Sequence, residues 1–374
     1  MPKIDPASSP SYSQNPSEQE LKNKAKAIYH VLAPRKIHSS TLEGWSTRAA
    51  IHEMGLMLKT YKADLQQSNS SHLKQIDWIV YNLEYASSIQ DLINVTDENA
   101  SLIPQMICLK IAALKVGESL VFPGGYMGIS NRPGRGNLPG HAILYEVIAE
   151  PNQKYSFIIN NTGDGIGHHK TNTMSKRTQQ LEYRNLDAQD LNGDFWFSIC
   201  KLKKNPRRNV KDIYRFIDKK LNKHNGNKVS SRQIKFQRTG ICAWKSISTW
   251  VHGKMAPGLK TKKRRTHEEI MYYRCKKNWI ENKIQELKDP ILQNYIKEHM
   301  VAHKKTFISS SIEKISVFFK IFFKKECKPH RYYQGEKLIE LLNNELQQKK
   351  QRLEKKLDIL IAKTKVSDES FPGD

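Results

Sequence analysis

The chain has 374 residues, 38% of them hydrophobic, with 62 lysine or arginine residues against 37 acidic ones and a net charge of +25. It is too long for one small domain and too rich in apolar residues to be disordered throughout, and its charge predicts an acidic partner, which nucleic acid, an anionic membrane or an acidic protein face would each supply. Its five cysteines are widely spaced without paired C-x-x-C motifs, which indicates neither a disulfide framework nor a zinc site and favours a reducing, cytoplasmic compartment. We therefore expect no metal and no cofactor.

The N-terminal part of the chain divides into a tail and a helical region. Residues 1–17 have no apolar segment after a basic start, so we expect a disordered tail and no Sec-type signal peptide. Over residues 18–110 apolar side chains recur every three or four positions, as at Ile51, Met54 and Leu58, which predicts helices.

Residues 111–256 follow a different pattern, in which short apolar runs alternate with Gly, Pro and Asn turns. Such runs predict a sheet. We expect strands over 119–122, 142–148, 155–159 and 195–202, then a helix over 210–221, a loop as far as Gln233, and a helix that begins at Cys242.

Residues 257–374 are basic and predicted to be helical, including a long helix over 336–365 with an imperfect leucine seam. An apolar stripe over 308–323, with lysines nearby, is compatible both with helix packing and with binding at a membrane surface. No apolar run approaches the roughly 20 residues of a membrane span. We expect this basic region to be the part that contacts an acidic protein or an anionic membrane.

One set of residues has the chemistry of a thiol hydrolase, which needs a thiolate, an imidazole that moves the proton, a polar group that orients the imidazole, and donors for an oxyanion. Cys242 opens an expected helix, and the positive N-terminal end of a helix lowers the pKa of a thiol. His141 begins an expected strand after a loop rich in Gly and Pro. Two further histidines, His168 and His169, follow the TGDGIG turn, and we expect both to be exposed.

The orienting residue is expected just after the next strand, where the sequence reads FIINNTGDG. Asn160, Asn161 and Asp164 are the candidates. An amide can orient an imidazole ring, whereas a carboxylate also stabilises its protonated form. The residue types alone leave the choice open.

The order of histidine, then an amide or acid after the next strand, then glutamine and cysteine resembles that of the clan CE cysteine peptidases. These are the ubiquitin-like-protein-specific proteases and their bacterial effector relatives. The segments GHAILYEV, FIINNTGDG and QRTGICAWKS carry the resemblance, within residues 116–255. The chain departs from the family where Ile-Cys-Ala replaces the frequent Asp-Cys-Gly and where no tryptophan follows the histidine.

The resemblance implies an α+β fold with a papain-like, ubiquitin-like-protease core, in which an antiparallel sheet packs on a buried nucleophile helix and helical regions flank both ends. It implies a catalytic set of Cys242, His141, Gln237 and a third residue. Asn161 is preferred because it lies 20 positions after His141, and Asp164 remains the alternative.

The implied activity is that of a deubiquitinase-like cysteine protease, which cleaves conjugates of ubiquitin or a ubiquitin-like protein through a thioester. Related effectors of intracellular bacteria act inside a host cell, which a chain without a Sec-type signal would also fit. Two other functions stay open, an acetyltransferase on the same scaffold and a non-enzymatic basic adaptor for lipid or nucleic acid.

Overall fold

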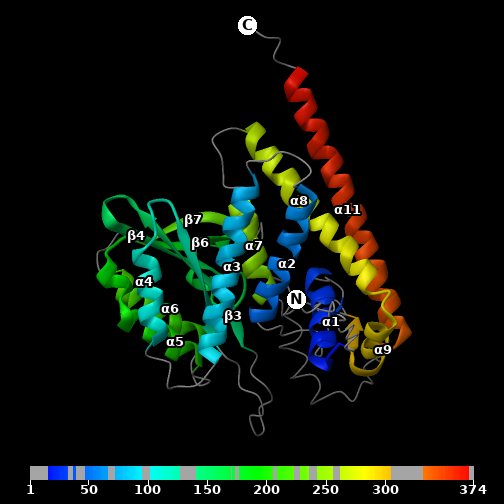
Figure 1. The fold of residues 1–374 in the computed structure, drawn as a ribbon, viewed down its shortest axis with the longest axis horizontal. Helices are drawn as coiled ribbons and strands as arrows, with labels where there is room; N and C mark the ends of the chain where they lie inside the picture. The colour runs from blue at the N-terminus through cyan, green and yellow to red at the C-terminus, as the bar shows by residue number, and fades with distance from the viewer. Residues whose placement is uncertain are drawn as a thin grey trace, which may run out of the picture.

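The fold is α+β, as expected: an antiparallel sheet with helices on both faces continues into a region made mainly of helices (Figure 1). It is taken from a computed structural model of the chain. That structure describes residues 16–32, 37–38, 47–65, 72–94, 102–126, 140–169, 171–172, 177–204, 209–222, 228–235, 242–255, 262–304 and 332–369.

The larger sheet has the order β2-β3-β4-β6-β5 within the described ranges, and β7 pairs with β6. All its pairings are antiparallel. Strands β4 and β5 pair along one edge of β6, and β7 pairs along the other. The strands are β2 (Ser119–Tyr126), β3 (His141–Glu150), β4 (Lys154–Asn160), β5 (Thr171–Asn172), β6 (Arg177–Leu186) and β7 (Lys228–Lys235).

Strand β3 is buried on both faces, which explains why its sequence AILYEVIA is almost continuously apolar. Side chains alternate between the two faces of a strand. Accordingly, Ala142 and Leu144 belong to one hydrophobic cluster, while Ile143, Tyr145 and Val147 belong to the other.

The cluster that contains Ile143 lies between the sheet and a group of four helices. Phe157 of β4 and Trp196 are fully buried within it, with ring centroids 6.1 Å apart. The helices are α3 (His72–Asn94), α4 (Leu102–Ala112), α5 (Gly193–Lys204) and α6 (Val210–Leu221).

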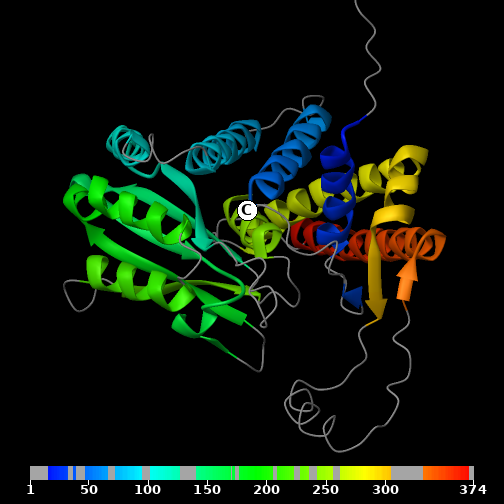
Figure 2. The same cartoon turned by 90° about the horizontal axis from the view of Figure 1, so that it is seen from below.

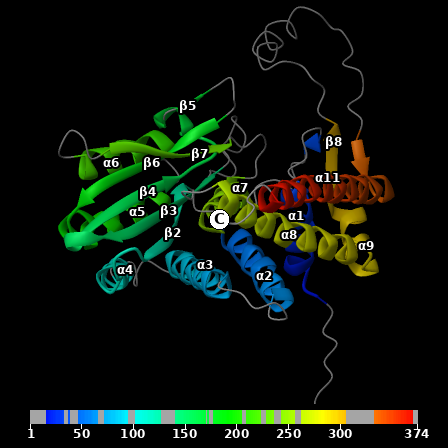
Figure 3. The ribbon, with the colours of Figure 1, turned by 90° about the horizontal axis from the view of Figure 1, so that it is seen from above.

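The other cluster surrounds α7, which lies between the sheet and the helices α2 and α8 (Figure 3). Helices α8 and α11 run side by side on the side of α7 away from the sheet (Figures 2 and 3). Besides the first half of α3, the helices here are α1 (Glu18–Leu32), α2 (Thr47–Leu65), α7 (Cys242–Met255), α8 (Lys262–Glu286), α9 (Pro290–His299) and α11 (Glu336–Glu369).

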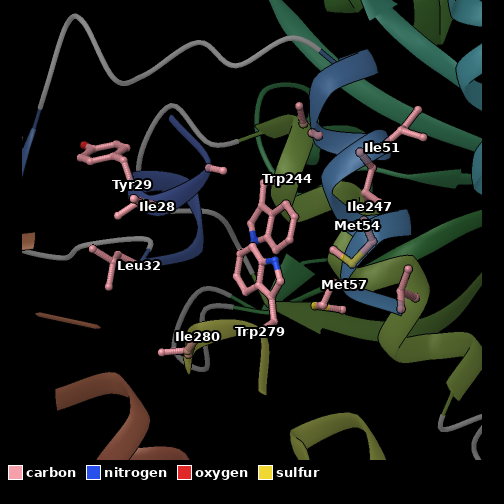
Figure 4. Close-up of a cluster of buried hydrophobic side chains, with 14 of the residues drawn as sticks. Ile28, Tyr29, Leu32, Ile51, Met54, Met57, Trp244, Ile247, Trp279 and Ile280 are labelled. Carbon is pink, nitrogen blue, oxygen red and sulfur yellow. The ribbon is translucent and has the colours of Figure 1, made fainter. Parts of the chain in front are cut away.

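Two stacked tryptophans join α7 to α8 at the centre of this cluster. The rings of Trp244 and Trp279 are 4.8 Å apart and nearly parallel, at 11°. They lie between Ile28 of α1 and Met54 of α2 (Figure 4). The domain boundary expected between residues 256 and 257 therefore lies between α7 and α8, and both helices contribute to the same hydrophobic cluster.

The expected strand over 195–202 is wrong, because this segment lies in helix α5. Its buried residues, Phe195, Trp196, Ile199 and Cys200, follow helical spacing, and the Asn192 side chain accepts a hydrogen bond from the Phe195 amide in the first turn. The aromatic FWF run resembled a strand only because helix and strand patterns are ambiguous in short apolar runs.

Several strands were not expected from the sequence. Strand β7 occupies part of the expected loop before Gln233, and the polar sequence of β6 was not recognised as a strand. Both are held by backbone pairing with neighbours distant in sequence, which leaves little local pattern. A second, small sheet of order β1-β8-β9 joins the two regions that were expected to be helical, 18–110 and 257–374. Its strands are β1 (Ile37–His38), β8 (Val301–Lys304) and β9 (Tyr332–Gln334).

Other expectations are met where the structure describes them. The helix over 210–221 and the helix that begins at Cys242 are present, and helices occupy most of 18–110. Most of the expected N-terminal tail and all of the stripe over 308–323 lie outside the described residues. No helix within the described ranges is long and apolar enough to cross a bilayer.

Helix α5 carries a buried lysine whose charge the fold disfavours. Lys203 is 7% exposed, its Nζ donates to Gln90 Oε1, and burial lowers its pKa to about 7. Between pH 7 and the usual lysine pKa, the unfolded chain binds a proton that the folded chain does not. The free energy of unfolding should therefore rise with pH across this window.

Replacing this lysine should remove that dependence. We expect Lys203→Met to be more stable than the wild type at pH 6, with the advantage shrinking by up to about 1.4 kcal/mol per pH unit as the pH rises from 7 towards 10. Urea denaturation of both proteins at several pH values measures this. An identical pH dependence in the two proteins would show that Lys203 remains charged in the fold.

Candidate active site

The candidate site lies where β3 begins, β4 ends and α7 begins. Adjacent strands β3 and β4 are antiparallel, with Leu144 opposite Asn160, so the start of one strand lies beside the end of the other. This arrangement brings His141 next to Asn161. Helix α7 packs on β3 and places Cys242 against the same strand end.

Cys242 is the first residue of α7 and is partly exposed. The Ala142 amide donates a hydrogen bond to its Sγ, with N and S 3.4 Å apart. One turn later, the Ser246 hydroxyl donates to the Ala142 carbonyl at 3.4 Å. These two contacts fix the first turn of the helix on the strand that carries His141.

The far end of α7 is held by an ion pair. Lys254 pairs with Glu146 of β3, which is 2% exposed and also accepts a hydrogen bond from the Ser119 hydroxyl at 2.6 Å. Loss of Lys254 would leave the buried charge of Glu146 uncompensated, which destabilises a protein. The helix is thus attached to β3 at both ends, which fixes the position of Cys242 along the strand.

His141 is 6% exposed and contacts both neighbours of the site. Its Nε2 lies 2.8 Å from Asn161 Oδ1, and its imidazole is near enough to the Cys242 thiol for each group to shift the pKa of the other. Because Nε2 faces Asn161, Nδ1 is the nitrogen left for the thiol. The three side chains therefore form one group, in which His141 interacts with both Asn161 and Cys242.

The pKa values of this pair move towards a thiolate and an imidazolium. Burial alone would raise the pKa of Cys242, but the hydrogen bond and charge of His141, together with the Ala142 and Ala243 amides, lower it below its usual value. Burial alone would lower the pKa of His141, but Cys242, then Asn161, and then the charge of Asp164 raise it.

The close approach of β2 to His141 depends on glycine. Gly125 has a φ of +103°, and a Cβ there would lie 1.9 Å from the His141 carbonyl oxygen. A Cβ at Gly124 would lie 2.2 Å from the Tyr145 ring. The Gly-Gly pair thus lets β2 pair with the start of β3, where Tyr126 is opposite His141.

Asn161 and Asp164 differ in what they contact. Asn161 is fully buried and contacts the imidazole directly. The exposed Asp164 carboxylate accepts a hydrogen bond from the Tyr126 hydroxyl at 2.6 Å and acts on His141 through its charge. The geometry therefore favours Asn161 as the orienting residue. Gln237 lies outside the described residues.

Nothing in the sequence pattern singled out Tyr214, and the expectation that His169 is exposed was wrong. His169 is 5% exposed, and its Nε2 lies 2.5 Å from the hydroxyl of Tyr214, which itself contacts Asn161. Only His168 is exposed, as expected. Tyr214 lies on the apolar face of α6, where helical periodicity predicts burial but not contact with a polar site.

Within the described ranges, no group of three or more His, Cys, Asp or Glu side chains is arranged to hold a metal ion. No protein-family model matches the chain, and no match was found among curated proteins. A thiol, an imidazole and a buried amide meet at this site, and these are the kinds of group that thiol-based acyl transfer requires.

We expect Cys242 to be alkylated by iodoacetamide faster than Cys108 at pH 7, because its pKa is lowered whereas burial raises the pKa of Cys108. Without the imidazole, burial would be the largest influence on the pKa of Cys242 and would raise it. His141→Ala should therefore raise the pKa of Cys242 and slow its alkylation at pH 7 by about tenfold.

Peptide mapping by mass spectrometry at a series of pH values measures both rates in one sample, with Cys108 as the internal control. If Cys242 reacts no faster than Cys108, or keeps its rate in His141→Ala, the two side chains do not form an activated pair.

Proposed function

We propose that this protein is a cysteine peptidase of the deubiquitinase-like type, with Cys242 as nucleophile, His141 as general base and Asn161 as orienting residue. The observation that carries the proposal is the meeting of these three side chains at the first turn of α7, where His141 is hydrogen-bonded to Asn161 and lowers the pKa of Cys242. Its pKa directions are those that a reactive thiolate needs.

In the proposed reaction, the Cys242 thiolate attacks the carbonyl carbon of the scissile amide, and the oxyanion is held by the Cys242 amide and Gln237. The His141 imidazolium gives its proton to the departing amine, which leaves a thioester on Cys242. Neutral His141 then takes a proton from water, whose oxygen attacks the thioester. The carboxylic acid and the free thiol are the products.

Asn161 holds the imidazole in position throughout this cycle. Its oxygen accepts from Nε2–H in both the neutral and the protonated ring, so Nδ1 keeps facing Cys242. The substrate class rests on the resemblance of the His-Asn-Gln-Cys order to the ubiquitin-like-protein-specific proteases. Their substrates are conjugates of ubiquitin or a ubiquitin-like protein.

Hydrolysis of a fluorogenic ubiquitin C-terminal conjugate tests this proposal, with the same conjugates of ubiquitin-like proteins assayed in parallel. We expect turnover by the wild type and none by Cys242→Ala at an unchanged melting temperature. Probes that carry a C-terminal electrophile should label Cys242. Acetyl transfer from acetyl-CoA, with no hydrolysis of any conjugate, would point instead to the acetyltransferase alternative.

Two substitutions test which residue orients the imidazole of His141. Asn161→Ala should lower kcat by about tenfold or more, because the imidazole loses its orienting contact. Asp164→Asn keeps an oxygen that accepts from Tyr126 and removes only the charge, so it should lower kcat by less than about threefold. A larger loss in Asp164→Asn than in Asn161→Ala would assign the role to the carboxylate.

A further inference from the structure

Behind Asn161, a buried hydrogen-bonded chain leads away from the candidate site. The Tyr214 hydroxyl of α6 lies 3.0 Å from Asn161 Nδ2 and 2.5 Å from His169 Nε2. His169 Nδ1 lies 2.8 Å from the Gln179 carbonyl oxygen in β6. Tyr214 is 2% exposed and His169 is 5% exposed, so both lie inside the fold.

The chemistry of these groups determines which nitrogen of neutral His169 carries the proton and which group donates in each hydrogen bond. A carbonyl oxygen only accepts, so the Gln179 carbonyl requires the proton of His169 on Nδ1. His169 Nε2 is then an acceptor, and the Tyr214 hydroxyl donates to it. The Tyr214 oxygen is left to accept from the Asn161 amide nitrogen.

This chain of hydrogen bonds is satisfied by only one orientation of the Asn161 amide. With Nδ2 towards Tyr214, Oδ1 faces His141 Nε2, which must therefore carry the proton of the neutral ring. Nδ1 of His141 is then free to take the proton of Cys242. A reversed amide would present a donor to Nε2, would favour the opposite tautomer and would leave Nδ1 unable to act as base.

Backbone groups of the turn after β4 support the same orientation. The Gly163 amide donates to Asn161 Oδ1 at 3.0 Å, and Asn161 Nδ2 donates to the Asp164 carbonyl at 2.5 Å. These contacts lie within the turn itself. Tyr214 adds an anchor from α6, a helix fixed in the core, and so connects the amide to the rest of the fold.

Local packing brings the turn and α6 together. Gly165 has a φ of +87°, and a Cβ there would lie 2.4 Å from Val210 Cγ2 and 2.8 Å from Tyr214 Cε2. Only glycine permits this approach. The His168 ring stacks on Tyr214 at 4.4 Å and 6°, so the turn holds the tyrosine ring as well as its hydroxyl.

We propose that Tyr214 and His169 are positioning residues that fix the orientation of the Asn161 amide and, through it, the tautomer of His141. The inference rests on the proposed function, because it concerns how the base of that site is prepared. Burial raises the pKa of Tyr214 far above its usual value, so its hydroxyl stays protonated and able to donate.

The first test measures the tautomers themselves. In protein labelled with ¹⁵N-histidine, we expect nitrogen–proton correlation spectra at pH 8 to show neutral His169 with its proton on Nδ1 and His141 with its proton on Nε2. The spectra are recorded in Cys242→Ser, which has no thiolate to retain a second proton on His141. The opposite tautomer at either histidine would overturn the proposal, whether or not any substrate is turned over.

The second test removes the hydroxyl of Tyr214. In Tyr214→Phe, we expect the alkylation profile of Cys242 to move to higher pH and kcat on a ubiquitin conjugate to fall by about tenfold with KM unchanged. The matched control is Tyr183→Phe, which also loses a buried hydroxyl, one that donates to Asp218 at 2.8 Å. The control should leave the alkylation profile and kcat unchanged.

A double-mutant cycle separates orientation from general packing. If Tyr214 acts through the Asn161 amide, Tyr214→Phe should have no further effect on Cys242 alkylation in an Asn161→Ala background. Additive effects, or a wild-type alkylation profile in a folded Tyr214→Phe protein, would overturn the proposal.

These readouts separate the two proposals. Alkylation and tautomers require no substrate, so failure to cleave ubiquitin conjugates would overturn the proposed function while these measurements still decide the positioning role. If Tyr214→Phe does not fold, the tautomers in the Cys242→Ser protein decide it.

Discussion

The hydrogen bond from the Ala142 amide to Cys242 Sγ joins the start of α7 to the start of β3, and the geometry of the whole site depends on that junction. His141 is the residue before Ala142, so the contact that places the thiol also places it beside the imidazole. The junction is held because β3 is buried on both faces and because Lys254 and Glu146 attach the far end of α7 to the same strand. A shift of α7 along β3 would separate the thiol from the imidazole and break the ion pair between Lys254 and the buried Glu146.

The helices beyond α7 form part of the same hydrophobic core. Trp279 of α8 stacks on Trp244 and donates a hydrogen bond from its indole to Glu53 Oε1 of α2 at 2.8 Å, while Lys283 pairs with the same carboxylate. The buried charge of Glu53 is therefore compensated. Helix α7 is enclosed by the sheet on one side and by α2 and α8 on the other, which explains why the basic α8 carries buried apolar residues such as Tyr272, Trp279 and Ile280.

In the proposed site, the polar groups around Asn161 let an amide take the place of a carboxylate. A carboxylate accepts with either oxygen, whereas an amide orients a base only if its oxygen points the right way. Here the surroundings present a donor, the Gly163 amide, on the oxygen side and two acceptors, the Asp164 carbonyl and the Tyr214 hydroxyl oxygen, on the nitrogen side. Asp164 remains near enough to stabilise imidazolium by its charge, so orientation and charge come from different residues.

The sequence alone determined the features with a local cause: α7 beginning at Cys242, the strand at His141, the helix over 210–221 and the α+β class, because helix starts and apolar periodicity are written in neighbouring residues. Tertiary structure decided the rest. Helix periodicity buried Phe195 and Trp196 where an aromatic run suggested a strand, and β7 formed only because β6 lay beside it. Contact between Asn161 and His141, and the burial of His169 behind Tyr214, required three segments distant in sequence to meet. Such contacts depend on how strands and helices pack together. Local patterns in the sequence do not predict that packing.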